Sequence, residues 1–295
     1  MKVNKPGRKS LKKTVLAAAA AVGAITFLFQ GFTQVMVAAE IGKMDKIPTS
    51  YTNYTTGSSQ VTQSNLLEGY KKANYKVGTI DLEYYRNQKP TSKDMTKENA
   101  AEIGAQDLWK IFDLNLEGQV IEMGYQPSAE KFPRSSWYAD VLIDGKLSYC
   151  FSVDSVTGEL FSIGRSRTLK ENVSVAFDAA LDKNPQEYVA LAEKLAKKYN
   201  VVHSAVKSVK YNCQGYSDND PDISVDIAGE NGEIALMTFS RYDKVLLGIA
   251  YNSLYKPSLE NAEKYREEMQ KKAEEIKKSN PPADENEVPS LKVLQ

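Results

Sequence analysis

The sequence has 295 residues, 42% of them hydrophobic and 26% charged, proportions that are typical of a globular protein with about two domains. Formal charges balance over the whole chain, but six Lys and Arg residues precede the first acid, Glu40, so the remainder carries a charge of −6. An acidic remainder without a basic stripe argues against nucleic-acid binding. A chain with one histidine, His203, offers little scope for histidine-based catalysis or metal binding.

Residues 1–39 have the pattern of an export segment. Six cations come first, an apolar run over 15–29 follows, and Val37-Ala38-Ala39 offers the small residues that a signal peptidase requires. The positive-inside rule then predicts that the rest of the chain lies on the outer face of the cytoplasmic membrane, or is secreted, in a bacterium. Two outcomes stay open: a cleaved signal peptide, or a membrane anchor formed by the 23 residues of 15–37.

The next segment, residues 40–74, is polar and lacks an apolar period, which predicts a tether. A first module is predicted over 75–165, opening with strand-like spacing over 75–85. Thr96 then begins a helix with an apolar face. That face comprises Ala101, Ala105, Leu108 and Phe112. Four antiparallel strands are predicted over 120–125, 137–143, 147–154 and 159–163.

In the third of these strands, apolar and polar residues alternate, which is typical of a half-buried antiparallel strand. The pattern predicts that Phe151 faces the core and that Ser152 lies on the polar face. In the preceding strand, Tyr138, Asp140 and Leu142 share one face while Trp137 faces the core. A sheet covered by a helix on one side leaves its other face for a partner. Tyr138, Asp140 and Leu142 are therefore the predicted protein-contact residues.

A second module is predicted over 184–252, after a linker over 166–183, because the same order of elements returns. Its helix is expected to begin at Asn184-Pro185-Gln186-Glu187, with Asn184 as the cap. Its strands are predicted over 206–214, 221–228, 233–240 and 245–251. A charged helix over 257–279 and a disordered tail over 280–295 follow. The predicted class is α+β: two tandem modules, each with one helix packed on an antiparallel sheet of about four strands, and a C-terminal charged helix.

Two segments of the first module, Thr96–Ile103 and Phe151–Leu160, resemble the PepSY family. The family's pattern is a short Ala-containing helix, a strand that ends in Val-Asp, and a turn with Thr-Gly-Glu. In that turn, Asp154 is expected to cap the chain and Gly158 to adopt a positive φ. The second module departs from the pattern, with Ser240–Val245 in the equivalent place. The resemblance implies a PepSY/cystatin-like fold and a non-catalytic role in the bacterial cell envelope, such as the regulation of a secreted peptidase or wall hydrolase.

No catalytic, cofactor-binding or metal-binding residue is predicted. The acids of Asp218-Asn219-Asp220-Pro221-Asp222 alternate as in calcium loops, but Ile223 stands where the loop's glycine belongs, which favours a solvated turn. Nothing in the sequence brings the carboxylates of Glu122 and Asp140 together. Cys150 and Cys213 form an even pair in an exported protein, but the alternation of their strands places them on different faces, so a disulfide stays open.

The sequence therefore favours a non-catalytic binding or regulatory module that binds an envelope protein or peptidase. Two alternatives stay open. An unrecognised extracellular hydrolase would gather acids and His203 in one deep pocket. A structural spacer would present neither such a pocket nor a tyrosine-rich binding face.

Overall fold

The computed structural model of the chain describes residues 67, 69–129 and 132–279. The export segment, most of the predicted tether and the predicted tail lie outside these residues. No helix within the described residues has both the length and the apolar character needed to cross a membrane. The chain divides after Pro257 into two compact units.

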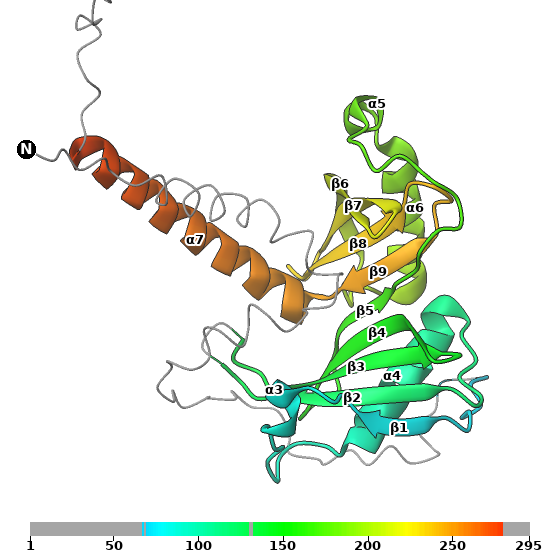
Figure 1. Cartoon of the computed structure of the whole chain (residues 1–295). Helices are drawn as coiled ribbons and strands as arrows, with labels where there is room; N and C mark the ends of the chain where they lie inside the picture. The colour runs from blue at the N-terminus through cyan, green and yellow to red at the C-terminus, as the bar shows by residue number, and fades with distance from the viewer. Residues whose placement is uncertain (1–66, 68, 130–131, 280–295) are drawn as a thin grey trace, which may run out of the picture. The chain divides into compact units, whose positions relative to one another are not determined.

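Nine strands form one mixed sheet in the order β1-β2-β3-β4-β5-β9-β8-β7-β6 (Figure 1). The strands are β1 Lys76–Thr79, β2 Val120–Gln126, β3 Ser136–Ile143, β4 Lys146–Asp154, β5 Leu160–Arg165, β6 Val206–Ser217, β7 Asp220–Gly229, β8 Ile234–Ser240 and β9 Leu246–Ala250. Strand β1 runs parallel to β2, and every other pair is antiparallel. Among the described residues, the helices are α3 Glu83–Arg86, α4 Lys97–Phe112, α5 Ala179–Lys183, α6 Gln186–Tyr199 and α7 Asn252–Ser279. The predicted α+β class is confirmed.

Helix α4 begins where the sequence predicts, because the Thr96 hydroxyl accepts a hydrogen bond from the Asn99 N–H at 3.2 Å. The helix lies close against the sheet at Gly104. A Cβ atom added there would sit 2.2 Å from the ring of Phe151 on β4. Phe151 is fully buried, as the alternation of its strand predicts.

Helix α6 packs on the second half of the sheet through Tyr188, whose ring lies 6.3 Å from that of Phe239. The prediction that Asn184 caps this helix is wrong. The residue before α6 is Pro185, which provides no side-chain cap, and Asn184 instead ends the short helix α5. Helix α5 lies inside the predicted linker, and Asp178 caps it by accepting hydrogen bonds from two backbone N–H groups.

Strands β5 and β9 join the two halves of the sheet, with Ile163 opposite Ile249 and Gly164 opposite Gly248. The sequence predicts a separate sheet for each module. This prediction is wrong, because β5 of the first module pairs with β9 of the second. One hydrophobic core runs under both halves on the side of α4 and α6. The two helices also meet, since the Tyr199 hydroxyl donates to the Ile111 carbonyl at 3.1 Å. Each half repeats the order of a helix and four antiparallel strands, and the division into modules stays a prediction.

The strand expected over 75–85 ends early, at Thr79. A turn of helix, α3, replaces its second part and lays the Tyr85 ring over Gly124 on the face opposite α4 and α6. A Cβ atom at Gly124 would lie 2.5 Å from that ring, so the strand needs glycine there. The face of the sheet that carries no long helix is therefore partly covered by α3.

Helix α7 begins at Asn252, five residues before the predicted start, so Pro257 lies inside its second turn. Tyr255 explains the early start, because it is buried and its hydroxyl donates to the Asp226 carboxylate at 2.6 Å. Ser253 also accepts a hydrogen bond from Arg134 Nη1 at 2.9 Å. These contacts hold the first turn of α7 to both halves of the sheet.

Candidate functional site

The turn between β4 and β5 is built around Asp154, whose side chain is fully buried. Its Oδ1 accepts hydrogen bonds from the N–H groups of Val156 and Thr157, at 2.8 and 2.6 Å, and its Oδ2 accepts one from Arg134 Nε at 2.6 Å. Gly158 has a φ of 77°, and its N–H donates to the Asp154 carbonyl at 3.0 Å. The predicted roles of Asp154 and Gly158 are confirmed.

The turn between β8 and β9 has the same backbone geometry without the glycine. The Lys244 N–H donates to the Ser240 carbonyl at 3.0 Å, and the Ser240 N–H donates to the Val245 carbonyl at 2.9 Å. The matching bond in the first half joins Asp154 to Glu159 at 2.8 Å. Lys244 has a φ of 63°, so it occupies the conformation that glycine takes in the first half. The residue pattern changes between the halves, but the turn is retained.

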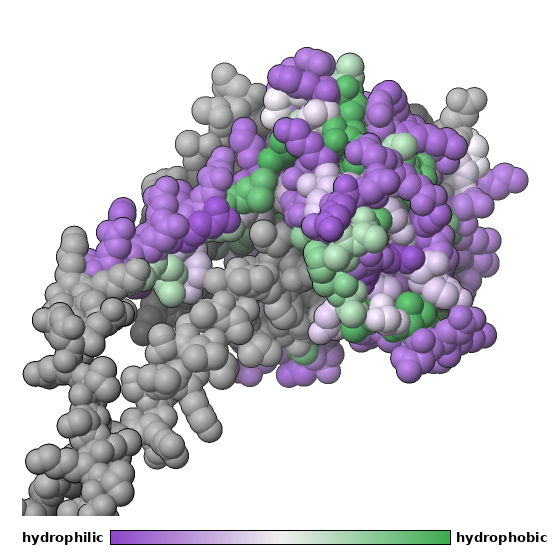
Figure 2. All heavy atoms as spheres, turned by 90° about the horizontal axis from the view of Figure 1, so that it is seen from above, coloured by the Kyte–Doolittle hydropathy of each residue, from purple (hydrophilic) through white to green (hydrophobic). Residues whose placement is uncertain are grey.

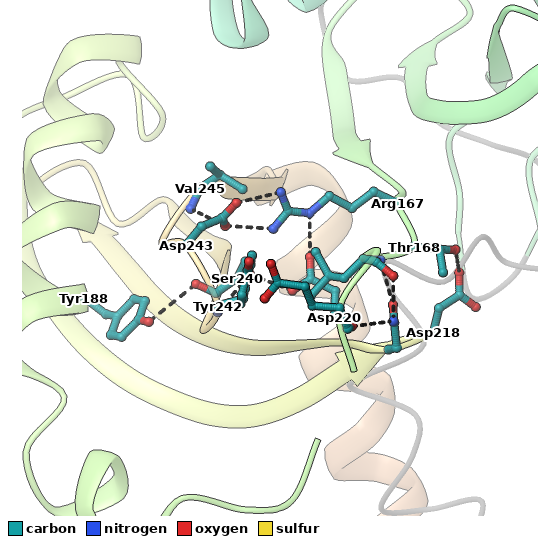
Figure 3. Close-up of polar contacts among 12 residues, drawn as sticks. Arg167, Thr168, Tyr188, Asp218, Asp220, Ser240, Tyr242, Asp243 and Val245 are labelled. Atoms are coloured by element: carbon teal, nitrogen blue, oxygen red, sulfur yellow. Dashed lines mark hydrogen bonds and ion pairs between the residues drawn. The ribbon is translucent and has the colours of Figure 1, made fainter. Parts of the chain in front are cut away.

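An ion-pair network around Arg167 supports the second turn (Figure 3). Arg167 Nε binds Asp220 at 2.7 Å, and its two Nη atoms bind the carboxylate of Asp243 at 2.8 and 2.7 Å. Ser240 completes the network by donating to Asp220 at 2.5 Å. The hydrogen bonds that Arg167 donates to Asp243 and Asp220 raise the pKa of Arg167, and the bond from Arg167 in turn lowers the pKa of Asp243. The network fixes the end of β8 to the start of the 166–183 segment.

A second arginine, Arg241, holds the following part of that segment. Its Nη1 donates to the Ala176 carbonyl at 3.1 Å and to Gln214 Oε1 at 2.8 Å. Its Nη2 donates to the Val175 carbonyl at 3.4 Å. The Gln214 amide pairs with the backbone of Asp178, accepting from its N–H at 3.0 Å and donating to its carbonyl at 2.9 Å. The 166–183 segment is thus bound to β6 and to the β8–β9 turn.

Four large apolar side chains are exposed around these contacts, and we call them the tip cluster. They are Val175, Phe177, Tyr216 and Tyr242, with exposed fractions of 37%, 63%, 53% and 44%. Seven large hydrophobic side chains are exposed in the part of the chain that the structure describes, so more than half of them gather here. The other three are Leu67, Leu147 and Tyr265.

Backbone contacts place the members of the tip cluster near one another. Tyr216 pairs with Pro221 across β6 and β7, and the Pro221 carbonyl accepts from the Arg241 N–H at 2.7 Å. Arg241 precedes Tyr242 and binds the backbone on the N-terminal side of Phe177. Seen from above, green apolar side chains reach the surface at several places between purple ones (Figure 2). The tip cluster is an apolar surface held on an ion-paired scaffold, and such surfaces mark interaction sites.

The three predicted contact residues lie on the face of the sheet away from α4 and α6. The Tyr138 hydroxyl donates to Asp140 Oδ1 at 3.0 Å, and its ring stacks on that of Tyr85, with centroids 6.5 Å apart. Burial raises the pKa of both Tyr138 and Asp140. Leu142 is half-buried at the end of the same row. Their role in binding a partner stays a prediction.

The structure places Glu122 directly opposite Asp140 on neighbouring strands, a pairing that the sequence pattern does not predict. Cross-strand neighbours have Cβ atoms about 5 Å apart, so the two carboxylates share one environment. Burial has the largest effect on the pKa of Asp140 and raises it, while the hydrogen bond from Tyr138 lowers it. The negative charge of Glu122 raises the pKa of Asp140 further. Sequence periodicity locates each residue on its strand but cannot supply the register between the strands.

Both cysteines are free. A bulge between Tyr211 and Cys213 turns Cys213 to the face opposite α6, where it lies across from Ser224. The two cysteines therefore lie on the same face of the sheet, and the expectation that they lie on different faces is wrong. Cys150 lies on β4, and the order β4-β5-β9-β8-β7-β6 puts five strand-to-strand steps between the two. At about 4.8 Å a step, this exceeds the roughly 7 Å that a disulfide can bridge between Cα atoms.

The acids of the 218–222 segment point to different partners. Asp218 accepts a hydrogen bond from the Thr168 hydroxyl at 3.2 Å, while Asp220 belongs to the Arg167 network. His203 is exposed and pairs with Glu233 at 2.9 Å. Within the described residues, no group of three or more potential metal ligands comes together.

A surface hollow of about 290 Å³ lies at the C-terminal end of α4. Tyr70 and Trp109 meet there edge to face, with ring centroids 5.6 Å apart, and residues 113–117 close one side. Its size is at the lower limit for small-molecule sites, and it shares no residue with the tip cluster.

No known protein family matches the sequence, and no curated protein does. Among solved structures, the C-terminal domain of YpeB from Bacillus megaterium is similar, with 12% sequence identity and a TM-score of 0.35. The alignment covers 55% of this chain and 65% of that structure, so the chain spans less than two thirds of it. A TM-score this low carries neither fold nor function from one protein to the other.

Proposed function

We propose that this protein is an exported, non-catalytic binding module of the bacterial cell envelope, and that it binds another envelope protein through the tip cluster. The observation that carries the proposal is the exposure of Val175, Phe177, Tyr216 and Tyr242 at one end of the second half. Phenylalanine and tyrosine supply large contact areas at low entropic cost, and they are enriched at protein interfaces.

The scaffold under the tip cluster favours recognition, because it is already ordered before a partner arrives. Arg167 and Arg241 each bind two or more groups and fix the loops that carry Phe177 and Tyr242. A surface that is held in place loses little conformational freedom on binding, which improves affinity. The charged groups around the cluster thus serve to position it.

The export segment over 1–39 and the PepSY resemblance supply the setting and the class of partner. We propose that the folded part lies outside the cytoplasmic membrane and that its partner is a secreted peptidase or wall hydrolase, which it regulates. This finer statement rests on the resemblance of Thr96–Ile103 and Phe151–Leu160 to the PepSY pattern.

The proposal is tested by capturing partners from solubilised envelopes with the intact protein. Phe177→Ala combined with Tyr242→Ala should abolish capture of any specific protein, because the pair removes two of the three exposed aromatic side chains of the tip cluster. Leu147→Ala is the matched control, since Leu147 is 52% exposed but lies on the β3–β4 hairpin of the other half. Equal capture by both variants and the unchanged protein would contradict the proposal.

Turnover assays separate binding from chemistry. Incubation of the protein with peptidoglycan, casein and ester substrates should release no product. Reproducible turnover that is lost in Asp140→Asn or His203→Ala would favour the hydrolase instead. Asp140 is the sharper target, because Glu122 lies opposite it.

A further inference from the structure

Strand β6 is the outermost strand on the second half of the sheet and has 12 residues. Its inner edge pairs with β7. Among the described residues, no backbone group pairs with the outer edge of β6 between Val206 and Gln214. A long edge of unpaired N–H and C=O groups is a template for another strand.

The C-terminal part of this edge already receives a backbone segment of the same chain. The side-chain amide of Gln214 pairs with the N–H and the carbonyl of Asp178, as a backbone peptide group would. Burial raises the pKa of Tyr211, and the nearby carboxylate of Asp182 raises it further. Residues 178–182 therefore lie beside 211–214, and Val206–Lys210 is the part of the edge that stays open.

The open part carries positive charge. Lys207 and Lys210 are both exposed, and no Asp or Glu occurs between Val201 and Ser217. Lys207 lies in a bulge between Val206 and Ser208, which twists the edge locally. Lysines and bulges on an edge discourage pairing with a second copy of the same strand, because like charges would face each other. The same charges attract a strand that carries carboxylates.

We propose that the edge of β6 at Val206–Lys210 accepts an extended, acidic segment of the partner as a tenth strand. Main-chain hydrogen bonds would supply much of the affinity, and the carboxylates facing Lys207 and Lys210 would supply the preference for acidic sequences. The inference rests on the proposed binding function and adds the chemical class of the partner. Tyr216 of the tip cluster lies on the same strand, beyond the part that residues 178–182 cover.

The test uses the full-length protein in detergent micelles and a capped hexapeptide that alternates Glu and Val. Backbone amide hydrogen exchange in 206–210 should slow when the peptide is added, and the dissociation constant can be measured by titration. A peptide with Lys in place of Glu should bind at least about tenfold more weakly. A peptide N-methylated at alternate positions, which cannot complete the hydrogen-bond ladder, should not slow exchange.

Substitutions on the strand supply the second arm. Lys207→Glu combined with Lys210→Glu should weaken binding of the acidic peptide by at least about tenfold, and the corresponding double change to Gln should have an intermediate effect. Lys146→Glu is the control, because Lys146 is exposed on β4 in the other half. Unchanged hydrogen exchange in β7 would establish that the variants remain folded.

Absence of slowed exchange in 206–210, or equal affinity for the acidic and basic peptides, would overturn the inference. The proposed function has a separate outcome. Loss of partner capture in the Phe177→Ala, Tyr242→Ala variant together with an unresponsive β6 edge would leave binding by the tip cluster intact and would reject only the strand pairing.

Discussion

At the scale of single residues, Phe151 and Gly104 form a close contact between α4 and the sheet. Phe151 is fully buried, and a methyl group on Gly104 would lie 2.2 Å from its ring. Phe151→Ala should lower the free energy of unfolding by about 3–5 kcal/mol, because it leaves a cavity in the core. Leu147→Ala, on the exposed end of the same strand, should cost far less. Chemical denaturation measures both.

The same contact predicts non-additive behaviour. Gly104→Ala alone should cost about 1–3 kcal/mol, because the helix must move away from the ring. In the Phe151→Ala background the added methyl group meets no ring, so the second substitution should cost little. Additive losses in the double variant would show that Gly104 is needed for a different reason.

Asp107 on α4 predicts a dependence of stability on pH. Burial raises its pKa from 3.8 to about 6, with Lys110 opposing the shift. A carboxyl whose folded pKa is raised holds its proton longer in the folded state, so its ionisation destabilises the fold as the pH rises from about 4 to 6. Asp107→Asn should therefore raise the free energy of unfolding by about 3 kcal/mol at pH 8 and change it little at pH 4.

Urea denaturation at pH 4 and pH 8 measures the change in the free energy of unfolding that Asp107→Asn causes. Asp113→Asn is the control, because it makes the same change of net charge at an exposed position just after the same helix. An equal gain at pH 4 and pH 8 for Asp107→Asn would mean that ionisation of this carboxyl is not the cause.

Several single-residue roles are readable from the sequence because they depend only on local geometry. Thr96 caps α4, and Asp154 and Gly158 form their turn as the pattern predicts. Cys213 is different. The bulge beside it exchanges the two faces of β6, and its position depends on the register with β7, which no local pattern encodes.

At the scale of elements, the two hairpin turns preserve one geometry with different residues. Lys244 adopts a φ of 63° where Gly158 adopts 77°. Lys244→Gly should therefore stabilise the protein by about 0.5–1 kcal/mol, because it removes the strain of a side chain in the left-handed region. The substitution also removes the ion pair between Lys244 and Glu187. This pair is exposed, so its loss should cost little stability.

The reverse change is predicted for the first half. Gly158→Ala should destabilise the protein by about 1–2 kcal/mol, since the new Cβ atom adopts the unfavourable φ and lies 2.9 Å from Ile103 Cδ1. Thermal unfolding of the two variants side by side gives the comparison. Stabilisation by both, or by neither, would contradict the equivalence of the turns.

Element positions follow largely from periodicity and turn residues, and all eight strands of the two predicted repeats lie close to their expected bounds. Helix α5 has five residues, too few to show a helical period. The early start of α7 depends on Tyr255, which reaches Asp226 on β7, a contact between segments distant in sequence.

At the scale of the whole molecule, one sheet and one hydrophobic core extend through both halves. The pairing of β5 with β9 could not be predicted, because periodicity identifies strands but not which edges meet. The continuous core predicts that residues 67–257 unfold cooperatively. Tyr188→Ala leaves a cavity in the second half of the core. If the whole core unfolds together, this substitution should also speed amide hydrogen exchange in β3 and β4 of the first half. Two separate unfolding transitions would contradict this.

The proposed function places the partner at the tip cluster, where Phe177 is the most exposed of the seven side chains. The most direct measurement places a photo-crosslinking amino acid at Phe177 in the full-length protein in living cells, with Leu147 as the control position. Binding through the tip cluster predicts that illumination attaches one envelope protein at Phe177 and none at Leu147, and that Arg241→Ala, which releases the loop, reduces the yield. Equal crosslinking at both positions, or none at Phe177 in intact cells, would contradict it.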